Sequence, residues 1–545
     1  MAGRILSVIP ARKGSKGIPR KNLRKLGKDP LVAHAIKTSK KSNRIDHVVL
    51  TTDSQEIAQI GRQYGVDTII DRPEHLATDE ISLAPVIKHA FEEVNGDFEY
   101  VLCFQPTAPL VSVTSIDSGV DKCIEENAES LVFIRNSTHY YWKATCGDYV
   151  PMSGDRKSRQ EMDPIYEEVG VFLSHKNLVR RGQRVGDDPL FKEVDRQEGV
   201  DIDTHADWLV AENYLRRKQL VYRLIGGAGT GIGHVYRGIT IADHIIEHDV
   251  LFALQQKDDL AIRMLDESNY DYWVFDDEQV FQKYVKTESP DIVVNDVLDT
   301  SAEMIKFLKN CGSRVVNFED LGSGMYHADA VINALYEHSN PPENHYFGFK
   351  YFCLRNEFIY ATPLAEIPSV DKVMISFGGT DESNLTAKTL RALSELDHDL
   401  NLDVVLGLGS TQKETLAPIT DEYPPNISVE ISQDIKSMAE HMQQADLLIT
   451  SNGRTIFEAA SLNLPVISMA QNHHEEKHPY SHISRGVLFL GRGHYVSEDT
   501  IRSAVIDYIA DRSMRESMRS ALASHDIANG VKRVKRILFE GTDEN

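Results

Sequence analysis

A basic, glycine-bearing segment follows the first apolar run of the chain and could bind an anion. Residues 9–23 read IPARKGSKGIPRKNL, which sets Arg12, Lys16 and Lys21 beside Gly17. Glycines let backbone N–H groups approach an anion closely, and the cations would neutralise a triphosphate and the charge that develops on leaving pyrophosphate. The GxxxxGK[ST] spacing of a Walker loop is absent. The segment predicts a phosphate-binding loop, with a merely solvated basic loop as the alternative.

Two carboxylates stand two residues apart much further along the chain. They are Asp201 and Asp203 of the string DIDTHADW. In an extended strand, side chains at this spacing point to the same side. Mg²⁺ prefers carboxylate and phosphate oxygens, so the pair could hold this metal against a triphosphate. The alternative is a solvated strand end, with Asp207 in the first turn of a helix.

A histidine follows a glycine-rich run in the second part of the chain. The string GGAGTGIGHVYR comes after the apolar run VYRLI and places His234 at a helix start. A neutral imidazole there could act as a base. A structural histidine is the alternative, and the glycine pattern fits dinucleotide binding only loosely.

Two turns nearer the carboxyl end could hold a nucleotide. In SFGGTD, Gly378 and Gly379 follow a strand, where their N–H groups can receive a diphosphate. In TSNGRTIFEA, Asn452 and Thr455 occupy a strand-to-helix turn, and Glu458 lies one turn further. A carboxylate there suits ribose hydroxyls, with helix packing or capping as the alternative.

These candidate residues depend on elements that alternate along the whole chain. Short Val-, Ile- and Leu-rich runs alternate with longer amphipathic segments, the pattern of parallel strands joined by crossover helices. A fresh apolar run directly after the amphipathic segment DWLVAENYLRRKQL marks a boundary near residue 219, and a proline-bearing stretch marks a hinge at residues 361–370. We therefore predict an α/β protein with one doubly wound sheet and two Rossmann-like halves, over residues 1–218, 219–368 and 369–545.

The first part resembles the N-acylneuraminate cytidylyltransferases and their relatives acting on pseudaminic and legionaminic acids. The resemblance covers nearly all of residues 3–215 and rests on six ordered strings: IPARKGSKGIPRKNL, LTTDSQEIA, DRPEHLATDE, FQPTAPL, SRQEMDPIYEEVG and DIDTHADWLVAE. It implies a magnesium-dependent nucleotidyltransferase that uses CTP to make a CMP-nonulosonic acid. Arg12 and Lys21 would be catalytic, and Asp201 and Asp203 would bind Mg²⁺. The implied substrate-binding residues are Ser15, Lys16, Asn22, Arg72, Gln105, Arg159, Gln160 and Tyr166, with Arg72 toward the cytidine and Gln105 toward the sugar.

Two positions depart from the pattern of that family. The usual QPTSPLR appears as QPTAPLV, with Ala108 and Val111, and the usual Asn-Gly appears as Val169-Gly170. Both lie near the place where the family receives its sugar. The choice among sialic, legionaminic and pseudaminic acid therefore stays open.

The second part resembles the UDP-sugar hydrolase of the pseudaminic acid pathway and, more distantly, the UDP-GlcNAc transferase that builds the peptidoglycan lipid intermediate. Over residues 221–500 the resemblance rests on the three glycine-containing strings and implies a two-lobed GT-B module. Gly378, Gly379 and Glu458, with Asn452 and Thr455 beside them, would hold the UDP-sugar. His234 would activate the water that displaces UDP. A UDP-sugar glycosyltransferase and a non-catalytic regulatory module are the alternatives.

The two activities would not be consecutive in a pathway. A phosphoenolpyruvate-dependent nonulosonic acid synthase must lengthen the released sugar by three carbons before it can receive CMP. Such a synthase is therefore expected as a pathway partner.

Composition limits the other partners. The formal net charge of −23 disfavours sequence-independent binding to nucleic acid or an anionic membrane. No apolar stretch has the length of a signal-peptide core or a membrane span, so a cytoplasmic location is expected. The aromatic, β-prone segment NSTHYYWKATCGDYVP predicts a homodimer formed through residues 136–165.

Overall fold

The chain forms two compact units, residues 1–217 and 218–545. A computed structural model describes residues 3–145, 147–152, 158–225, 232–379, 381–407, 410–421 and 423–539. The predicted boundary between residues 218 and 219 lies one residue beyond this division. Within the glycine-rich run before His234, residues 226–231 lie outside the described part of the chain.

The first unit is built on one seven-stranded sheet with the order β11-β7-β10-β6-β1-β4-β5. Strands β1, β4, β5 and β6 are parallel to one another, and β10 is antiparallel to β6 and β7. The central strands are buried on both faces, which explains their continuous apolar sequences. The sheet strands are β1 (Ile5–Pro10), β4 (His47–Thr52), β5 (Thr68–Asp71), β6 (Tyr100–Phe104), β7 (Ser130–Asn136), β10 (Tyr166–His175) and β11 (Leu190–Val194). The helices are α1 (Leu31–Lys41), α2 (Gln55–Gln63), α3 (Leu83–Glu93), α4 (Val113–Glu125), α5 (Lys176–Arg180) and α6 (His205–Arg216).

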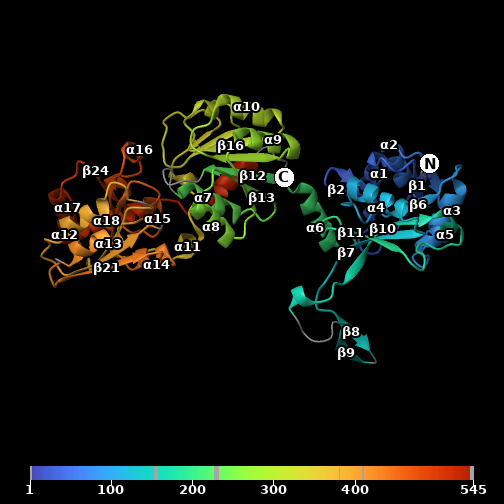
Figure 1. Ribbon diagram of the computed structural model, residues 1–545, viewed down its shortest axis with the longest axis horizontal. Helices are drawn as coiled ribbons and strands as arrows, with labels where there is room; N and C mark the ends of the chain where they lie inside the picture. Colours follow the sequence, from blue (N-terminus) through green and yellow to red (C-terminus); the bar gives the residue numbers. More distant parts are fainter. Residues whose placement is uncertain are drawn as a thin grey trace. The chain divides into compact units, whose positions relative to one another are not determined.

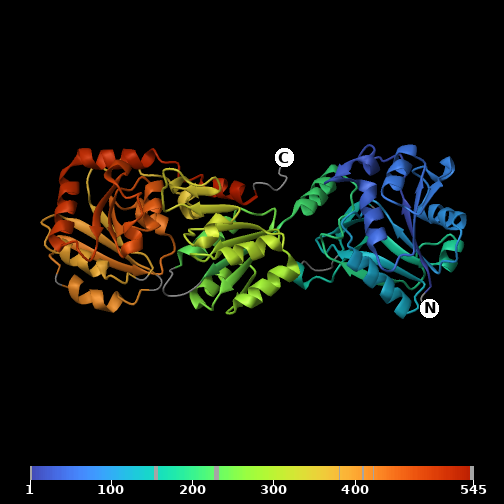
Figure 2. The same ribbon diagram turned by 90° about the horizontal axis from the view of Figure 1, so that it is seen from above.

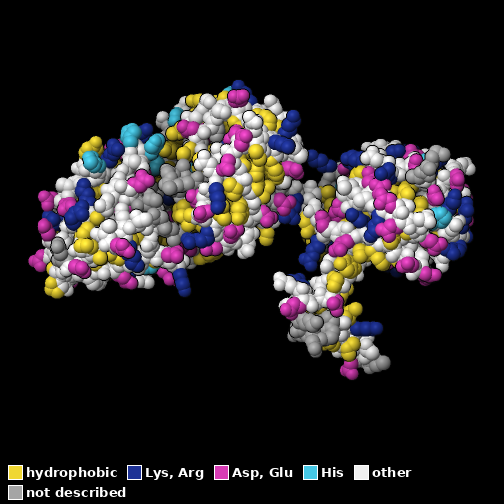
Figure 3. All heavy atoms as spheres, viewed as in Figure 1, with side chains coloured by type: hydrophobic (Ala, Val, Ile, Leu, Met, Phe, Trp, Pro, Cys, Tyr) yellow, Lys and Arg dark blue, Asp and Glu magenta, His cyan; other side chains and the backbone are white. Residues whose placement is uncertain are grey.

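A two-stranded hairpin extends from this sheet. Strands β8 (Trp142–Thr145) and β9 (Asp148–Pro151) pair only with each other, and Figure 1 shows them standing away from the seven-stranded sheet. Trp142 is 58% exposed and Tyr149 is 75% exposed, and Figure 3 shows hydrophobic side chains along this projection. Of the predicted dimer segment 136–165, residues 146 and 153–157 lie outside the described residues.

The second unit contains two fully parallel sheets, one in each lobe. Their orders are β14-β13-β12-β15-β16-β17-β18 and β21-β20-β19-β22-β23-β24. Figure 2 shows helices on both sides of each sheet, the layering of a Rossmann-like lobe. The predicted α/β class with a two-lobed GT-B-like module is confirmed.

The first lobe and its connection to the second contain the following elements: β12 (Gln219–Ile225), α7 (Gly233–Ala242), β13 (Asp249–Gln255), α8 (Asp259–Glu267), β14 (Tyr272–Phe275), α9 (Glu278–Glu288), β15 (Ile292–Asp296), α10 (Ala302–Asn310), β16 (Arg314–Phe318), β17 (Ala330–Asn333), β18 (His345–Phe347) and α11 (Asn356–Tyr360). The second lobe contains β19 (Lys372–Ser376), α12 (Leu385–Leu393), β20 (Leu400–Leu406), α13 (Lys413–Thr420), β21 (Ile427–Gln433), α14 (Met438–Gln443), β22 (Leu447–Ser451), α15 (Thr455–Ser461), β23 (Val466–Ala470), α16 (His473–Glu476), β24 (Val487–Arg492), α17 (Glu498–Ala510) and α18 (Arg512–Ala523).

The last helix crosses back to the first lobe. Helix α19 (Gly530–Phe539) buries its apolar side chains in the same core as β12 and β13, and Figure 1 shows its red ribbon beside β12. Arg314 of β16 donates hydrogen bonds to the carbonyls of Ile537 and Leu538. The structure thus differs from the predicted lobe 369–545, because a helix near its carboxyl end completes the core of the first lobe. The apolar spacing of α19 identifies a buried helix face without identifying its partner.

None of the helices in the described part of the chain is long and apolar enough to cross a membrane.

Candidate functional site

The predicted phosphate loop lines a cavity at the carboxyl ends of β1 and β6. The cavity has a volume of about 260 Å³. Its lining brings together six of the residues that the sequence nominated, although they come from three separate strings: Arg12, Ser15, Lys21, Asn22, Arg72 and Gln105. Lys16 does not line it and is 79% exposed at its side chain.

Backbone carbonyls hold two of these side chains in place. Asn22 Nδ2 donates to Arg12 O at 3.0 Å, which closes the loop on itself. Arg72 Nη2 donates to Thr51 O at 2.8 Å. Burial lowers the pKa of Arg72 to about 10, so the guanidinium stays charged at neutral pH. The cavity is thus also lined by a fixed cation from outside the loop.

Lys21 joins the loop to the predicted metal-binding string. Its buried Nζ donates to Ile202 O and lies 3.3 Å from Asp203 Oδ1. At Gly17 a Cβ atom would lie 2.1 Å from Asp203 O, so only glycine permits this close approach. Two strings more than 180 residues apart therefore meet at one edge of the cavity.

The two aspartates differ in environment. Asp201 is largely buried, and its Oδ1 has no hydrogen-bond partner among the described residues. Burial raises the pKa of Asp201, with Asp203 adding a smaller effect in the same direction. The Asp203 side chain is 76% exposed. An orphaned carboxylate oxygen beside a second carboxylate suits a hard cation such as Mg²⁺, to which a triphosphate would add further oxygens. The described residues contain no cluster of three or more His, Cys, Asp or Glu that could hold a metal alone.

Besides Lys16, three predicted substrate-binding residues of the first unit do not line this cavity. Arg159 and Gln160 lie in an exposed 3-10 turn, Arg159–Glu161, and Tyr166 is 41% exposed at the start of β10. The Tyr166 hydroxyl donates to Glu193 at 3.4 Å. Their contact with substrate stays a prediction.

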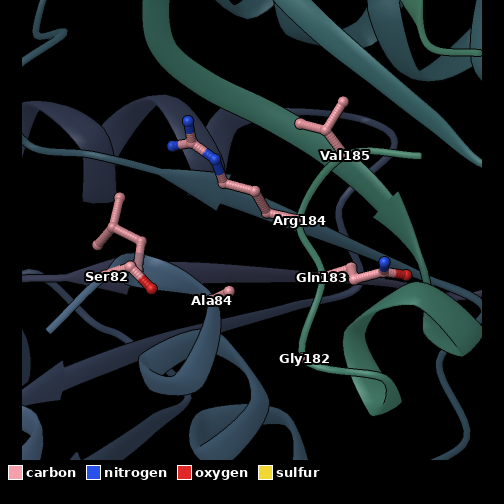
Figure 4. A pocket seen from close by; sticks show the side chains of 7 residues that line it. Ser82, Ala84, Gly182, Gln183, Arg184 and Val185 are labelled. Atoms are coloured by element: carbon pink, nitrogen blue, oxygen red, sulfur yellow. The ribbon is translucent and has the colours of Figure 1, made fainter. Parts of the chain in front are cut away.

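A neighbouring cavity was not predicted from the sequence. It has a volume of about 460 Å³, lies between the start of α3 and residues 182–185, and shares Leu83 with the first cavity. Figure 4 shows Ser82 and Ala84 on one side and Gln183, Arg184 and Val185 on the other. Arg184 is the cation among its lining residues; its guanidinium lies 3.2 Å from Glu168 and 5.2 Å from the Phe172 ring. Residues 182–185 follow the short helix α5 without a recognisable motif, so the sequence carried no signal for them.

The departures from the family pattern lie mostly in the core. Ala108, Val111 and Val169 are buried in one apolar cluster, so their side chains do not face a sugar. Gly170, which keeps the glycine of the family pattern, does face a predicted site residue, because a Cβ there would lie 3.0 Å from Gln105 Nε2. The three departures themselves make no direct contact of this kind with a predicted sugar-binding residue.

In the second unit, His234 belongs to a buried charged cluster. His234 Nδ1 pairs with Asp296 Oδ1, and Nε2 has no hydrogen-bond partner among the described residues. Arg237 Nε and Tyr222 Oη donate to Asp296 Oδ2 at 2.7 Å and 2.8 Å. Burial by itself raises the pKa of Asp296, but Arg237 and His234 hold this pKa well below its usual value. Because Asp296 stays ionised, its pairing with Nδ1 fixes the imidazole ring of His234 and leaves Nε2 to act as a base.

Further charges surround this pair. Arg237 also pairs with Glu319, and a Cβ at Gly233 would lie 2.9 Å from the Arg454 side chain of the second lobe. Arg454 lies 4.7 Å from the Phe352 ring. The predicted turn at residues 452–455 therefore approaches the helix that carries His234. Of this cluster the sequence nominated only His234, because nothing in the string VVND distinguishes Asp296 from a strand-end cap.

The predicted diphosphate turn is closely packed. Gly378 has a φ of 79°, and a Cβ at Gly407 would lie 2.2 Å from Gly378 O. Gly407 was not nominated, although its glycine allows the two strand ends to meet. Thr380 of the string SFGGTD lies outside the described residues.

The other predicted nucleotide contacts are engaged within the protein. Asn452 is 1% exposed; its Nδ2 donates to Glu475 O at 2.6 Å, and its Oδ1 accepts from Ser481. Thr455 begins α15. Glu458 is 9% exposed and accepts from Arg355 Nε at 2.8 Å. Glu458 therefore fits the helix-packing alternative in this structure, and its contact with a ribose stays a prediction.

Comparison with known proteins identifies two domains. Residues 6–150 match the family model described as Cytidylyltransferase, and residues 373–534 match the Glycosyltransferase family 28 C-terminal domain. Neither match alone covers half of the chain.

Two curated relatives and one solved structure represent the similarities. Uncharacterized protein MJ1062 of Methanocaldococcus jannaschii is 31% identical over 263 residues, covering 45% of this chain and 54% of its own length. The CMP-N,N'-diacetyllegionaminic acid synthase of Legionella pneumophila is 30% identical over 230 residues, covering 40% of this chain and 98% of its own. The crystal structure of MurG from Acinetobacter baumannii is 15% identical, covers 59% of this chain and 99% of its own, and has a TM-score of 0.47. The match spans about half the length of the first relative, so whole-chain activities remain proposals.

Proposed function

The chain belongs to the cytidylyltransferase family through its first unit, and we propose that this unit transfers CMP from CTP to a nonulosonic acid. The observation that carries the proposal is the cavity that gathers Arg12, Lys21, Arg72 and Gln105 beside Asp201.

The proposal gives each of these groups a role. The anomeric hydroxyl of the sugar attacks the α-phosphorus of CTP, the bond to the β-phosphate oxygen breaks, and pyrophosphate leaves. Arg12 and Lys21 neutralise the charge that develops on the leaving group, while Arg72 and Gln105 orient the two substrates. Asp201 and Asp203 would hold Mg²⁺, which supplies a further positive charge against the triphosphate.

The second cavity supports an acidic sugar as the acceptor. It adjoins the first through Leu83, and Arg184 could exchange Glu168 for a substrate carboxylate. Incubating the protein with CTP, Mg²⁺ and sialic, legionaminic or pseudaminic acid, and following pyrophosphate release, tests both substrates. Failure of all three acids would refute the nonulosonic acid assignment.

For the second unit we propose hydrolysis of a UDP-diacetamido-trideoxy sugar. The His234–Asp296 pair supports it, since His234 Nε2 could take a proton from the water that displaces UDP from the anomeric carbon. Gly378, Gly379 and Thr455 would receive the nucleotide, and Glu458 would reach the ribose only after releasing Arg355.

Glycosyl transfer is the second candidate, favoured by the match to the Glycosyltransferase family 28 C-terminal domain. The same imidazole could deprotonate an acceptor hydroxyl. Release of free sugar and UDP without an acceptor would favour hydrolysis, and UDP release that requires an added acceptor would favour transfer. No UDP release under either condition, together with UDP binding, would favour a regulatory module.

Two partners belong to the proposal. A second copy of the chain would pack on the exposed β8–β9 hairpin, which light scattering on the intact protein and on a Trp142→Ser/Tyr149→Ser variant would test. Dimeric mass in that variant would place the interface elsewhere. A phosphoenolpyruvate-dependent synthase would act between the two reactions.

A further inference from the structure

An acidic side chain occupies the cation face of the proposed CTP cavity. Asp79 lies in the loop between the 3-10 turn Glu74–Leu76 and α3, and it lines the same cavity as Arg12 and Lys21. Its Oδ1 pairs with Arg12, and its Oδ2 lies 3.1 Å from Lys16 Nζ. One carboxylate thus bridges two cations of the phosphate loop that lie more than 60 positions earlier in the sequence.

The other cations of the loop make a useful contrast. Arg20 pairs with Glu56 at 2.6 Å, but neither side chain lines the cavity. Glu80, directly beside Asp79, is exposed and has no ion pair among the described residues. The position of Asp79 within the cavity therefore sets it apart from the general acidity of the surface.

We propose that Asp79 is an internal competitor for the triphosphate: it holds Arg12 and Lys16 in the absence of nucleotide, is displaced when CTP binds, and returns as pyrophosphate leaves. The inference rests on the proposed CTP site. The Asp79 side chain is 38% exposed, so its ion pairs with Arg12 and Lys16 are weak enough to exchange. A triphosphate offers these cations more negative charge than a single carboxylate does. Asp79 would lower the affinity for both CTP and pyrophosphate.

The test compares Asp79→Asn with Glu80→Gln, which removes the same charge one residue away, and with Glu56→Gln, which frees Arg20 outside the cavity. Titration calorimetry with CTP and with inorganic pyrophosphate gives the affinities, and the Mg²⁺ concentration for half-maximal rate is measured in parallel. Asp79→Asn should tighten both ligands by roughly threefold to tenfold, as expected for two exposed ion pairs. The controls should stay within about twofold of wild type, and the Mg²⁺ requirement should not change.

The outcomes separate this inference from the function on which it rests. Unchanged or weaker CTP binding in Asp79→Asn overturns the inference, and so does equal tightening in Glu80→Gln, which would indicate only long-range charge. A raised Mg²⁺ requirement in Asp79→Asn would mean that Asp79 contacts the metal-bound nucleotide. This outcome would also overturn the inference that Asp79 competes with the nucleotide. Absence of CTP binding in the wild type would instead refute the proposed CTP site. Asp79→Glu, which keeps the carboxylate, should retain near-normal affinity and guards against a folding defect in Asp79→Asn.

Discussion

Both units place glycine-bearing turns at the carboxyl ends of parallel strands, but they use the polar side chains there differently. In the first unit the phosphate loop pairs its cations with exposed acids such as Asp79 and Glu56. In the second unit Asp296, Asn452 and Glu458 are buried and bonded to neighbouring parts of the protein. Exposed pairs can be exchanged for a ligand at little cost, whereas buried pairs are costly to break and hold geometry. The first site is therefore built for exchange and the second for fixed orientation.

The largest expected effect comes from removing the proposed metal ligands. Asp201→Ala and Asp203→Ala should each lower CMP transfer by about 10³-fold, because a metal ion at a phosphoryl centre supplies several kcal/mol. Pyrophosphate release measures the loss, and UDP release by the second unit of the same sample serves as the control. Normal magnesium-dependent turnover in both variants would contradict the metal site.

The next largest effect should come from breaking the His234–Asp296 pair of the second unit. Asp296→Asn should lower UDP release by roughly 10²-fold or more, since the ring of His234 would lose its orienting anion. Arg237 and His234 keep the pKa of Asp296 far below its usual value despite its burial, so the loss should appear across the whole working pH range. A rate equal to wild type, with His234→Ala equally active, would indicate a purely structural histidine.

Removing one cation from the exchangeable site should have a smaller effect. Lys21→Ala should lower kcat for CMP transfer by about 10²-fold, the value of a lost transition-state contact. Arg20→Ala is the matched control, because Arg20 is an exposed cation of the same loop that does not line the cavity. A change confined to KM would mean that Lys21 contributes only to ground-state binding.

The smallest expected effect concerns the sugar side. Gly170→Ala would place a methyl group 3.1 Å from the Gln105 Cβ atom, so the side chain of Gln105 must shift. Strain of about 1 kcal/mol should raise KM for the nonulosonic acid roughly fivefold while KM for CTP stays unchanged. Equal changes in both constants would show that Gln105 does not discriminate between the substrates.

The sequence predicted the fold class and most of the first site, because strand patterning and short polar strings can be recognised in the linear sequence. Arg12, Lys21, Arg72 and Gln105 follow strands whose carboxyl ends meet at one edge, which parallel topology requires. Asp79 also lies in the string DRPEHLATDE, but its partners Arg12 and Lys16 lie more than 60 residues away, and no spacing rule links them.

Other features could not be predicted because they depend on tertiary contacts. Asp296 meets His234 only through the approach of α7, and Arg184 lines a cavity only through the approach of α3. Ala108 and Val111 were associated with the sugar through their place in a motif, whereas their burial shows that they pack the core. Helix α19 carries an apolar face that any of several cores could accept.

The return of α19 to the first lobe also has a consequence for synthesis on the ribosome. The first unit has all of its sheet strands by residue 194 and can close its core while the rest of the chain is still being translated. The first lobe of the second unit must wait for Val531, Val534 and Phe539, which are made about 300 residues after β12 begins. Until then its apolar surface beside Leu220 and Phe252 is uncovered in the nascent chain, which makes this lobe the part most in need of chaperone protection.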